Sequence, residues 1–212
     1  MTLEEYTKEK ILSDLEKLQR LYNLKRVIRY NQSRNEKIQT ESVAEHIYGM
    51  HLLAQYFLPL EDPEMKLDRA KLLSMITLHD IDEVDEVENG DIVGYLKTAS
   101  MREMEIENMQ RVVRESPENM QDSMRDLLNE YESRVTPEAQ FVKALDKVEP
   151  VVHLSHEKVS LLLTEVLECT VEESLGIKTP YIKSFPFIEK FCLTAHKRLE
   201  EAGNFWKVPT KS

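Results

Sequence analysis

Helix-start signals recur along this chain, and no stretch alternates between polar and apolar residues for long enough to predict a strand. Ser42–Glu45 and Ser100–Glu103 have the pattern of a capping box, in which each end residue satisfies the other's free backbone N–H. Ser116-Pro117 and Thr136-Pro137 combine a hydroxyl cap with the proline typical of a first helical turn. The chain has only 5 glycines among its 212 residues. The sequence therefore predicts an all-α fold.

The expected helices follow from these caps and from apolar residues at helical spacing. They run over about 3–22, from Ser42 to a stop at Pro59, from Asp68 to about His79, over about 100–115, from Pro117, from Pro137, over 159–167 and over 187–202.

Charge and length exclude several classes of protein. The 28 Lys and Arg residues against 39 Asp and Glu give a net charge of −11, which argues against binding to a nucleic-acid polymer. The sequence has no apolar run of about 18 residues, so we expect no membrane span, and the polar start lacks the pattern of a signal peptide. Cys169 and Cys192 are too few for a disulfide scaffold or a cysteine-based zinc site, and we expect packed thiols. These observations predict a cytoplasmic protein of one domain.

Three features could carry chemistry. His46 follows the first capping box, His79-Asp80 ends a helix, and Asp146 lies within the otherwise apolar segment 141–148. Two imidazoles and two carboxylates form a ligand set suited to a borderline divalent metal. Asp146 could instead pair with Lys143 or Lys147, and that alternative stays open. His51 lies about 140° around the helix from His46, so the two rings cannot share a metal.

The order of these motifs resembles that of the HD-domain metal-dependent phosphohydrolases, more narrowly the branch with the bacterial 5′-deoxynucleotidases and their eukaryotic relatives. The residues that carry the resemblance are Ser42–His46, His79-Asp80 and 145–149, and it covers about 24–154. It implies a single helical-bundle domain with a core over 24–154 and a helical extension over 157–206. It also implies one divalent metal, of unspecified identity among Mn, Co, Fe, Ni, Zn and Mg. The metal ligands would be His46, His79, Asp80 and Asp146.

The resemblance further implies two catalytic carboxylates. Glu83 would position or deprotonate the attacking water, and Asp91 would organise the leaving oxygen and the sugar. About three residues are inserted between them relative to the family pattern, so Glu86 is an alternative to Glu83. We prefer Glu83, because on a continuing helix it would share a face with His79.

The resemblance also implies substrate-binding residues. Arg29-Tyr30 stands where the deoxynucleotidases have Arg and an aromatic residue, associated with the phosphate and with the deoxy sugar. A guanidinium can hold phosphate oxygens bidentately. Arg34 is a second phosphate candidate. His153 and His156 have no evident carboxylate partner and are expected on the surface.

The leading hypothesis is therefore a homodimeric phosphohydrolase that removes phosphate from nucleoside 5′-monophosphates, deoxynucleotides first, by metal-activated water. Two alternatives stay open. The substrate could be another phosphorylated nucleotide, such as a triphosphate or an alarmone. The protein could also be a non-catalytic helical binding protein that the metal stabilises.

Overall fold

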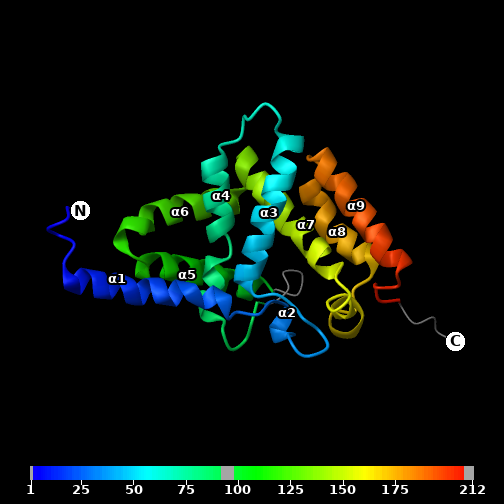
Figure 1. Ribbon diagram of the computed structural model, residues 1–212, viewed down its shortest axis with the longest axis horizontal. Helices are drawn as coiled ribbons and strands as arrows, with labels where there is room; N and C mark the ends of the chain where they lie inside the picture. Colours follow the sequence, from blue (N-terminus) through cyan, green and yellow to red (C-terminus); the bar gives the residue numbers. More distant parts are fainter. Residues whose placement is uncertain (1, 92–97, 208–212) are drawn as a thin grey trace.

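The computed structural model describes residues 2–91 and 98–207, and this part of the chain confirms an all-α fold (Figure 1). Within it, the one β-type pairing is an isolated antiparallel bridge between Ile28 and Ser42. The helical elements in chain order are α1 Lys8–Leu21, η1 Tyr22–Lys25, α2 Arg29–Gln32, α3 Val43–Glu61, α4 Arg69–Leu78, η2 Ile81–Asp85, α5 Ala99–Glu115, α6 Glu118–Ser133, α7 Pro137–Leu154, the π-helical turn η4 Leu162–Val166, α8 Val171–Ile182 and α9 Pro186–Glu201.

Helices α3 and α7 lie side by side at the centre of the molecule (Figure 1). α8 and α9 pack against α7 on one side, while α4 contacts α6 and α7 on the other. α5 packs against α6 and η2, and α1 reaches outward beside them toward the N-terminus (Figure 1). This arrangement brings the start of α3, the end of α4 and the middle of α7 close together.

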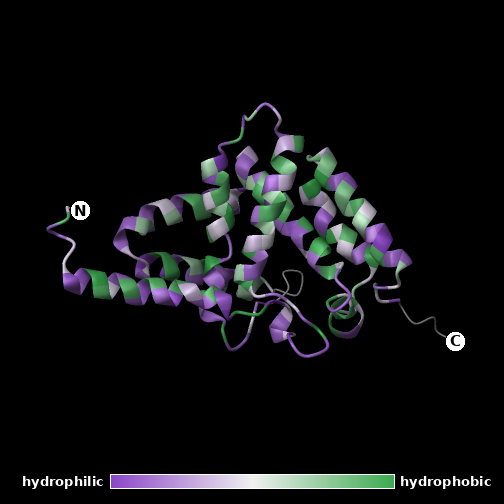
Figure 2. Ribbon diagram, in the orientation of Figure 1, coloured by the Kyte–Doolittle hydropathy of each residue, from purple (hydrophilic) through white to green (hydrophobic). Residues whose placement is uncertain are grey.

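The buried side chains form two clusters. The larger one joins α3, α4 and α7 to the C-terminal helices, and its members include Phe57, Phe141 and Ile188. The smaller one joins η1, η2, α5 and α6 to the start of α3, around Val43 and Val112. Hydrophobic residues gather where α3, α7, α8 and α9 meet (Figure 2). The C-terminal helices thus complete the main core.

Several predicted caps are confirmed. Ser42 and Glu45 form both hydrogen bonds of a capping box at α3. Asp68 caps α4 and Thr136 caps α7, with Pro137 in its first turn. These signals are local, so the sequence alone specifies them.

Other predicted boundaries were wrong. Helix α5 begins at Ala99, because Thr98 rather than Ser100 is its N-cap and the Thr98 hydroxyl accepts the Met101 N–H. Helix α1 begins at Lys8 rather than near residue 3, since Thr7 provides its cap. Pro59 does not stop α3, which continues to Glu61. A proline removes one helical hydrogen bond, and burial of the neighbouring Phe57 and Leu58 outweighs that loss.

The C-terminal region also differs from expectation. Residues 159–167 form only the short π turn η4 instead of an α-helix. Helix α8 was missed, although Thr170 and Glu173 form a capping box at its start. The helix over 187–202 is confirmed as α9.

The chain leaves helical geometry directly after α4, so the continuing helix expected through Glu83 is wrong. His79 is the C-terminal cap of α4, and Asp80 has φ −109° and ψ 28°. The turn redirects the chain into η2, which contains Glu83.

A left-handed turn lies beside the bridge to α3. Tyr30, Asn31 and Gln32 have φ values of 59°, 56° and 61°, a conformation that costs roughly 1–2 kcal/mol per residue. The turn is held by the 90–91 segment, since Asn31 N–H donates to the Asp91 carbonyl at 3.0 Å. Gly90, with φ +72°, permits this approach, because a Cβ there would lie 2.5 Å from the Ile28 carbonyl oxygen.

Among the described residues, no helix has the length and apolar character needed to cross a membrane.

Candidate metal centre

His46 is oriented by a carboxylate on the neighbouring helix. Its Nδ1 lies 2.7 Å from Glu149 Oε2 on α7. Because a carboxylate only accepts, Nδ1 carries a proton, and in the neutral ring Nε2 presents a lone pair. Gly49 makes room for this contact, since a Cβ at that position would lie 2.6 Å from Glu149 Oε1.

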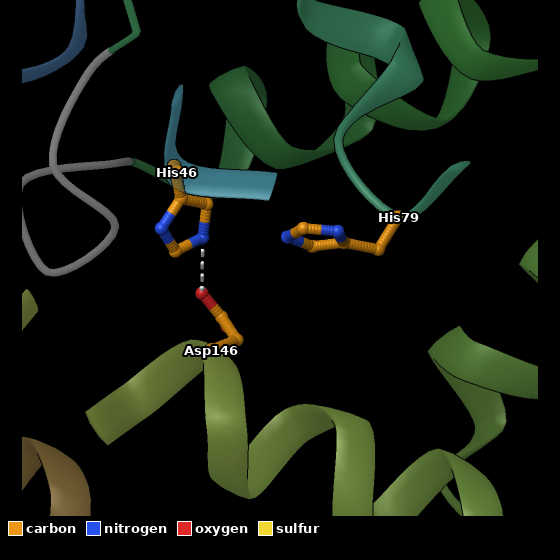
Figure 3. A group of neighbouring side chains, drawn as sticks. All are labelled: His46, His79 and Asp146. Carbon is orange, nitrogen blue, oxygen red and sulfur yellow. Dashed lines mark ion pairs between the residues drawn. The ribbon is translucent and has the colours of Figure 1, made fainter. Parts of the chain in front are cut away.

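The other three sequence candidates converge on His46 Nε2. Asp146 Oδ1 lies 3.5 Å and Asp80 Oδ2 lies 3.9 Å from this nitrogen. Asp80 Oδ2 also lies 3.0 Å from His79 Nε2. Figure 3 shows the two imidazoles and the Asp146 carboxylate turned toward a common point. The structure therefore brings all four predicted ligands together.

The residues fit a divalent cation. In the described part of the chain, His46 Nε2 and His79 Nε2 are buried without a hydrogen-bond partner. His79 Nδ1–H donates to the Ile76 carbonyl at 2.9 Å, so its Nε2 also presents a lone pair. Ligands about 2.1 Å from one ion lie about 3–3.5 Å apart, close to the spacing here. Two imidazoles and two carboxylates suit several first-row metals and do not select one.

The electrostatics of the site favour a positive charge. Burial and Arg29 lower the pKa of His46, but Glu149 and Asp146 outweigh them and raise it to about 9. The carboxylates thus attract a proton to His46, and a metal ion would compete for the same lone pair.

Asp146 serves two sets of neighbours, one through each oxygen. Oδ1 faces His46, while Oδ2 pairs with Lys143 at 2.9 Å and Lys147 at 3.0 Å. Tyr131 also donates to Oδ2, at 3.4 Å. Burial raises the pKa of Asp146, and the two lysines outweigh this and hold it well below its usual range. Asp146 therefore makes the ion pairs that the sequence left open and still faces the metal centre.

A cavity of about 540 Å³ opens beside the four candidate ligands, with Asp80 and Asp146 in its wall. Glu83 and Asp91 also line it, whereas Glu86 does not and instead accepts a hydrogen bond from Asn89 at 3.2 Å. The 3-10 turn η2, rather than a continuing helix, brings Glu83 to the wall.

Arg29 lines the same cavity and is buried among carboxylates. Its Nη1 donates to Glu41 Oε1 at 2.6 Å, and its Nε donates to Asp91 Oδ2 at 3.3 Å. Glu149 Oε2 lies 3.6 Å from Arg29 Nη1. Burial raises the pKa of Glu41 and Arg29 lowers it, with a net rise to about 7. Arg29 thus holds Asp91 and Glu41 in place as well as facing the cavity.

Tyr30 and Arg34 have different surroundings. Tyr30 lines the cavity, and its hydroxyl is buried without a hydrogen-bond partner among the described residues. The structure does not bring Arg34 to the cavity wall. Its guanidinium donates to the Thr40 carbonyl at 2.6 Å and to the Glu45 carboxylate.

Sequence reasoning missed several neighbours of the centre. Glu149 belongs to the 145–149 motif, but no role was predicted for it. His153 was expected on the surface, yet it is partly buried, stacks on Tyr30 at 6.3 Å, and its Nδ1 lies 3.6 Å from Glu41 Oε2. Positions 146, 149 and 153 share one face of a helix, and this spacing was the available signal.

The comparisons with known proteins agree with this geometry. A family model described as "HD domain" matches residues 21–188. The chain belongs to this family of helical proteins.

Among curated relatives, the chain is similar to the 5′-deoxynucleotidase HDDC2 of Xenopus laevis, with 30% identity over 61% of this chain and 61% of that protein. It is also similar to 5′-deoxynucleotidase hdd1 of Schizosaccharomyces pombe, with 32% identity over 54% of this chain and 57% of that protein. The chain thus matches less than two thirds of the length of these relatives.

Two solved structures share the fold. A protein described as a predicted metal-dependent phosphohydrolase from Magnetospirillum magnetotacticum MS-1 has a TM-score of 0.75 at 19% identity, over 94% of this chain and 100% of that one. The PH0347 protein from Pyrococcus horikoshii OT3 has a TM-score of 0.62 at 20% identity, over 87% of this chain and 99% of that one.

Replacing Glu149 by glutamine is expected to weaken metal binding by about 10–100-fold, because outer carboxylates fix the orientation and basicity of a ligating histidine. The measurement is the dissociation constant for Mn²⁺ or Zn²⁺ in competition with a chelator. Glu157→Gln, which changes an exposed glutamate just beyond α7, is the matched control. An unchanged constant in Glu149→Gln would show that His46 does not need this carboxylate.

Proposed function

We propose that this protein is a divalent-metal-dependent phosphohydrolase that removes phosphate from nucleoside 5′-monophosphates, with deoxynucleotides as the preferred substrates. The observation that carries the proposal is the convergence of two unpartnered imidazole nitrogens and two carboxylates at the wall of a cavity of about 540 Å³.

His46, His79, Asp80 and Asp146 would hold the metal. When bound, a divalent ion supplies Lewis-acid polarisation of a phosphoryl group and lowers the pKa of a coordinated water. Four protein ligands leave positions of an octahedron free for solvent and substrate. The open positions and the adjacent cavity favour catalysis over a purely structural ion, which protein groups would saturate.

Two further carboxylates would handle the protons of hydrolysis. Attack of water on phosphorus releases a proton and breaks the bond between phosphorus and the 5′ oxygen. The Glu83 carboxylate in the cavity wall would accept the proton from water, and the departing 5′ oxygen would take up a proton from Glu83 or from solvent. Asp91, oriented by Arg29, would bind the sugar side of the leaving group. Neither role needs a covalent intermediate.

Arg29 and Tyr30, which also line the cavity, would contact the substrate. The buried Tyr30 hydroxyl can bond a sugar or phosphate oxygen, and Arg29 can extend a guanidinium N–H to phosphate. Arg34 is left out of this proposal, since its guanidinium is bonded to Thr40 and Glu45 away from the cavity.

The choice of nucleoside monophosphates rests on the relatives, which are named as 5′-deoxynucleotidases. The match at about 30% identity supports the class of reaction more strongly than the sugar preference. The homodimer and the cytoplasmic location remain predictions from the sequence.

The test is phosphate release from a panel of ribo- and deoxynucleoside 5′-monophosphates. The protein is stripped with chelator and reloaded with Mn²⁺, Co²⁺ or Mg²⁺. We expect metal-dependent release, faster with deoxynucleotides than with ribonucleotides.

Other outcomes would overturn the proposal. Release from triphosphates or alarmones alone would change the substrate class and keep the enzyme. Metal binding without release from any of these compounds would favour the non-catalytic binding protein.

A further inference from the structure

Helix α8 forms a second wall of the cavity, outside the segment that carries the ligand motifs. Ser174, Ile177, Lys178 and Tyr181 all line the cavity. They occur at i, i+3, i+4 and i+7, so they share one helix face. Lys178 is buried, with 8% of its surface exposed.

Among the described residues, Lys178 differs from the other lysines of this cavity in making no direct ion pair with a carboxylate. Lys143 and Lys147 both pair with Asp146. In the described part of the chain, the Lys178 ammonium donates only to Ser174, at 2.9 Å to Oγ and 3.4 Å to the carbonyl oxygen. An ammonium has three N–H donors, so one remains for a ligand.

A chain of neutral groups fixes the position of this ammonium. His196 Nδ1 lies 2.8 Å from the Cys192 carbonyl, which only accepts, so this nitrogen carries the proton. His196 Nε2 is then an acceptor for the Ser174 hydroxyl at 3.0 Å. The Ser174 oxygen in turn accepts from Lys178. None of these three hydrogen-bonded groups carries a negative charge, so none of them neutralises the lysine.

We propose that Lys178 is an anion-binding residue of the cavity and that its remaining N–H binds a phosphoryl oxygen of the substrate. That this oxygen belongs to the phosphate group of a substrate rests on the proposed function. A buried charge without a partner is unfavourable, and a phosphate group would supply the missing negative charge. Burial lowers the pKa of Lys178 and outweighs the opposing effects of Cys192 and Cys169.

A purely structural role for Lys178 predicts different behaviour. If the residue served only to hold Ser174, its replacement would lower stability and leave anion binding unchanged. If it binds an anion, replacement by methionine removes an unpaired buried charge, so the melting temperature should stay the same or rise.

The experiment is a calorimetric titration of the protein with inorganic phosphate. The metal content of the protein is measured beforehand. We expect Lys178→Met to weaken phosphate binding at least 10-fold, without a lower melting temperature. Lys178→Arg, which keeps the charge, should stay within about threefold of the original protein. Lys183→Met removes an exposed lysine at the end of the same helix and should change neither quantity.

Phosphate affinity within twofold of the original in Lys178→Met would overturn the proposal, and so would an equal loss in Lys183→Met. This equilibrium measurement needs no turnover, so it separates the two proposals. Loss of phosphate binding in Lys178→Met without hydrolysis of any nucleotide by the original protein would retain this inference and reject the proposed function. Nucleotide hydrolysis with unaltered phosphate binding in the variant would do the reverse.

Discussion

Replacing Asp80 by alanine is expected to lower kcat/KM for a nucleoside monophosphate by at least about 10³-fold, or ~4 kcal/mol of transition-state stabilisation. Asp80 Oδ2 lies 3.0 Å from His79 Nε2 and 3.9 Å from His46 Nε2, so its loss removes the carboxylate that pairs with His79 and also faces His46. The side chain lies at the cavity and outside the two apolar clusters, so we expect the fold to survive. Metal content per chain, measured by elemental analysis, should fall together with phosphate release.

Glu88→Ala provides the matched control for Asp80→Ala. Glu88 lies in the same acid-rich segment, 80–91, but its side chain is exposed. We expect its replacement to leave metal content and release within twofold. If Asp80→Ala kept both its metal content and its phosphate release, Asp80 would not be a metal ligand. If the variant kept its metal but lost phosphate release, Asp80 would instead orient the water or the substrate.

Replacing Arg29 by methionine is expected to lower the free energy of unfolding by about 3–5 kcal/mol, because it leaves buried carboxylates without their counter-charge. The Arg29 guanidinium contacts Glu41 at 2.6 Å and Asp91 at 3.3 Å. Methionine keeps the apolar stem of the arginine and lacks only the guanidinium end, so most of the expected loss comes from the unpaired carboxylates. The measurement is urea unfolding of chelator-treated protein at pH 7.

The pH dependence provides a further check on the Arg29 prediction. The pKa of Glu41 is about 7 in the original protein, and loss of Arg29 removes a charge that lowers it, so the variant takes up a proton there at higher pH. The difference in stability from the original protein should therefore narrow as the pH falls from 9 toward 6. Arg34→Met, which removes a more exposed arginine paired with Glu45, should cost less than about 1 kcal/mol. A similar decrease in the free energy of unfolding in both variants would show that the burial of Arg29 does not increase its contribution to stability.

Sequence reasoning identified most of the fold because its strongest signals are local. The capping box at Ser42 and the caps at Asp68 and Thr136 each need only three or four neighbouring residues, and all are present. Pro59 was misjudged because the energy that keeps α3 helical past it comes from packing against distant helices. The end of α4 near His79 was predicted, but the 3-10 turn η2 that follows was not, because no local pattern indicates the turn at Asp80.

The candidate site could be predicted in part for the same reason. His46, His79, Asp80 and Asp146 stand in short motifs, and the structure brings them together. The contact between His46 and Glu149 joins residues 103 positions apart and has no local signature. Lys178 was also missed, because its place in the cavity depends on how α8 packs against α7.

The tight contact between Gly49 and Glu149 has a consequence for the history of this chain. A Cβ at position 49 would lie 2.6 Å from the glutamate oxygen, so alanine there would push the carboxylate away from the place where it contacts His46. A lineage that acquires alanine at 49 is therefore expected to change residue 149 or the spacing of the two helices as well. Aligned descendants of a common ancestor should therefore exchange these residues as a pair, and this covariation would record that α3 and α7 have kept the same separation.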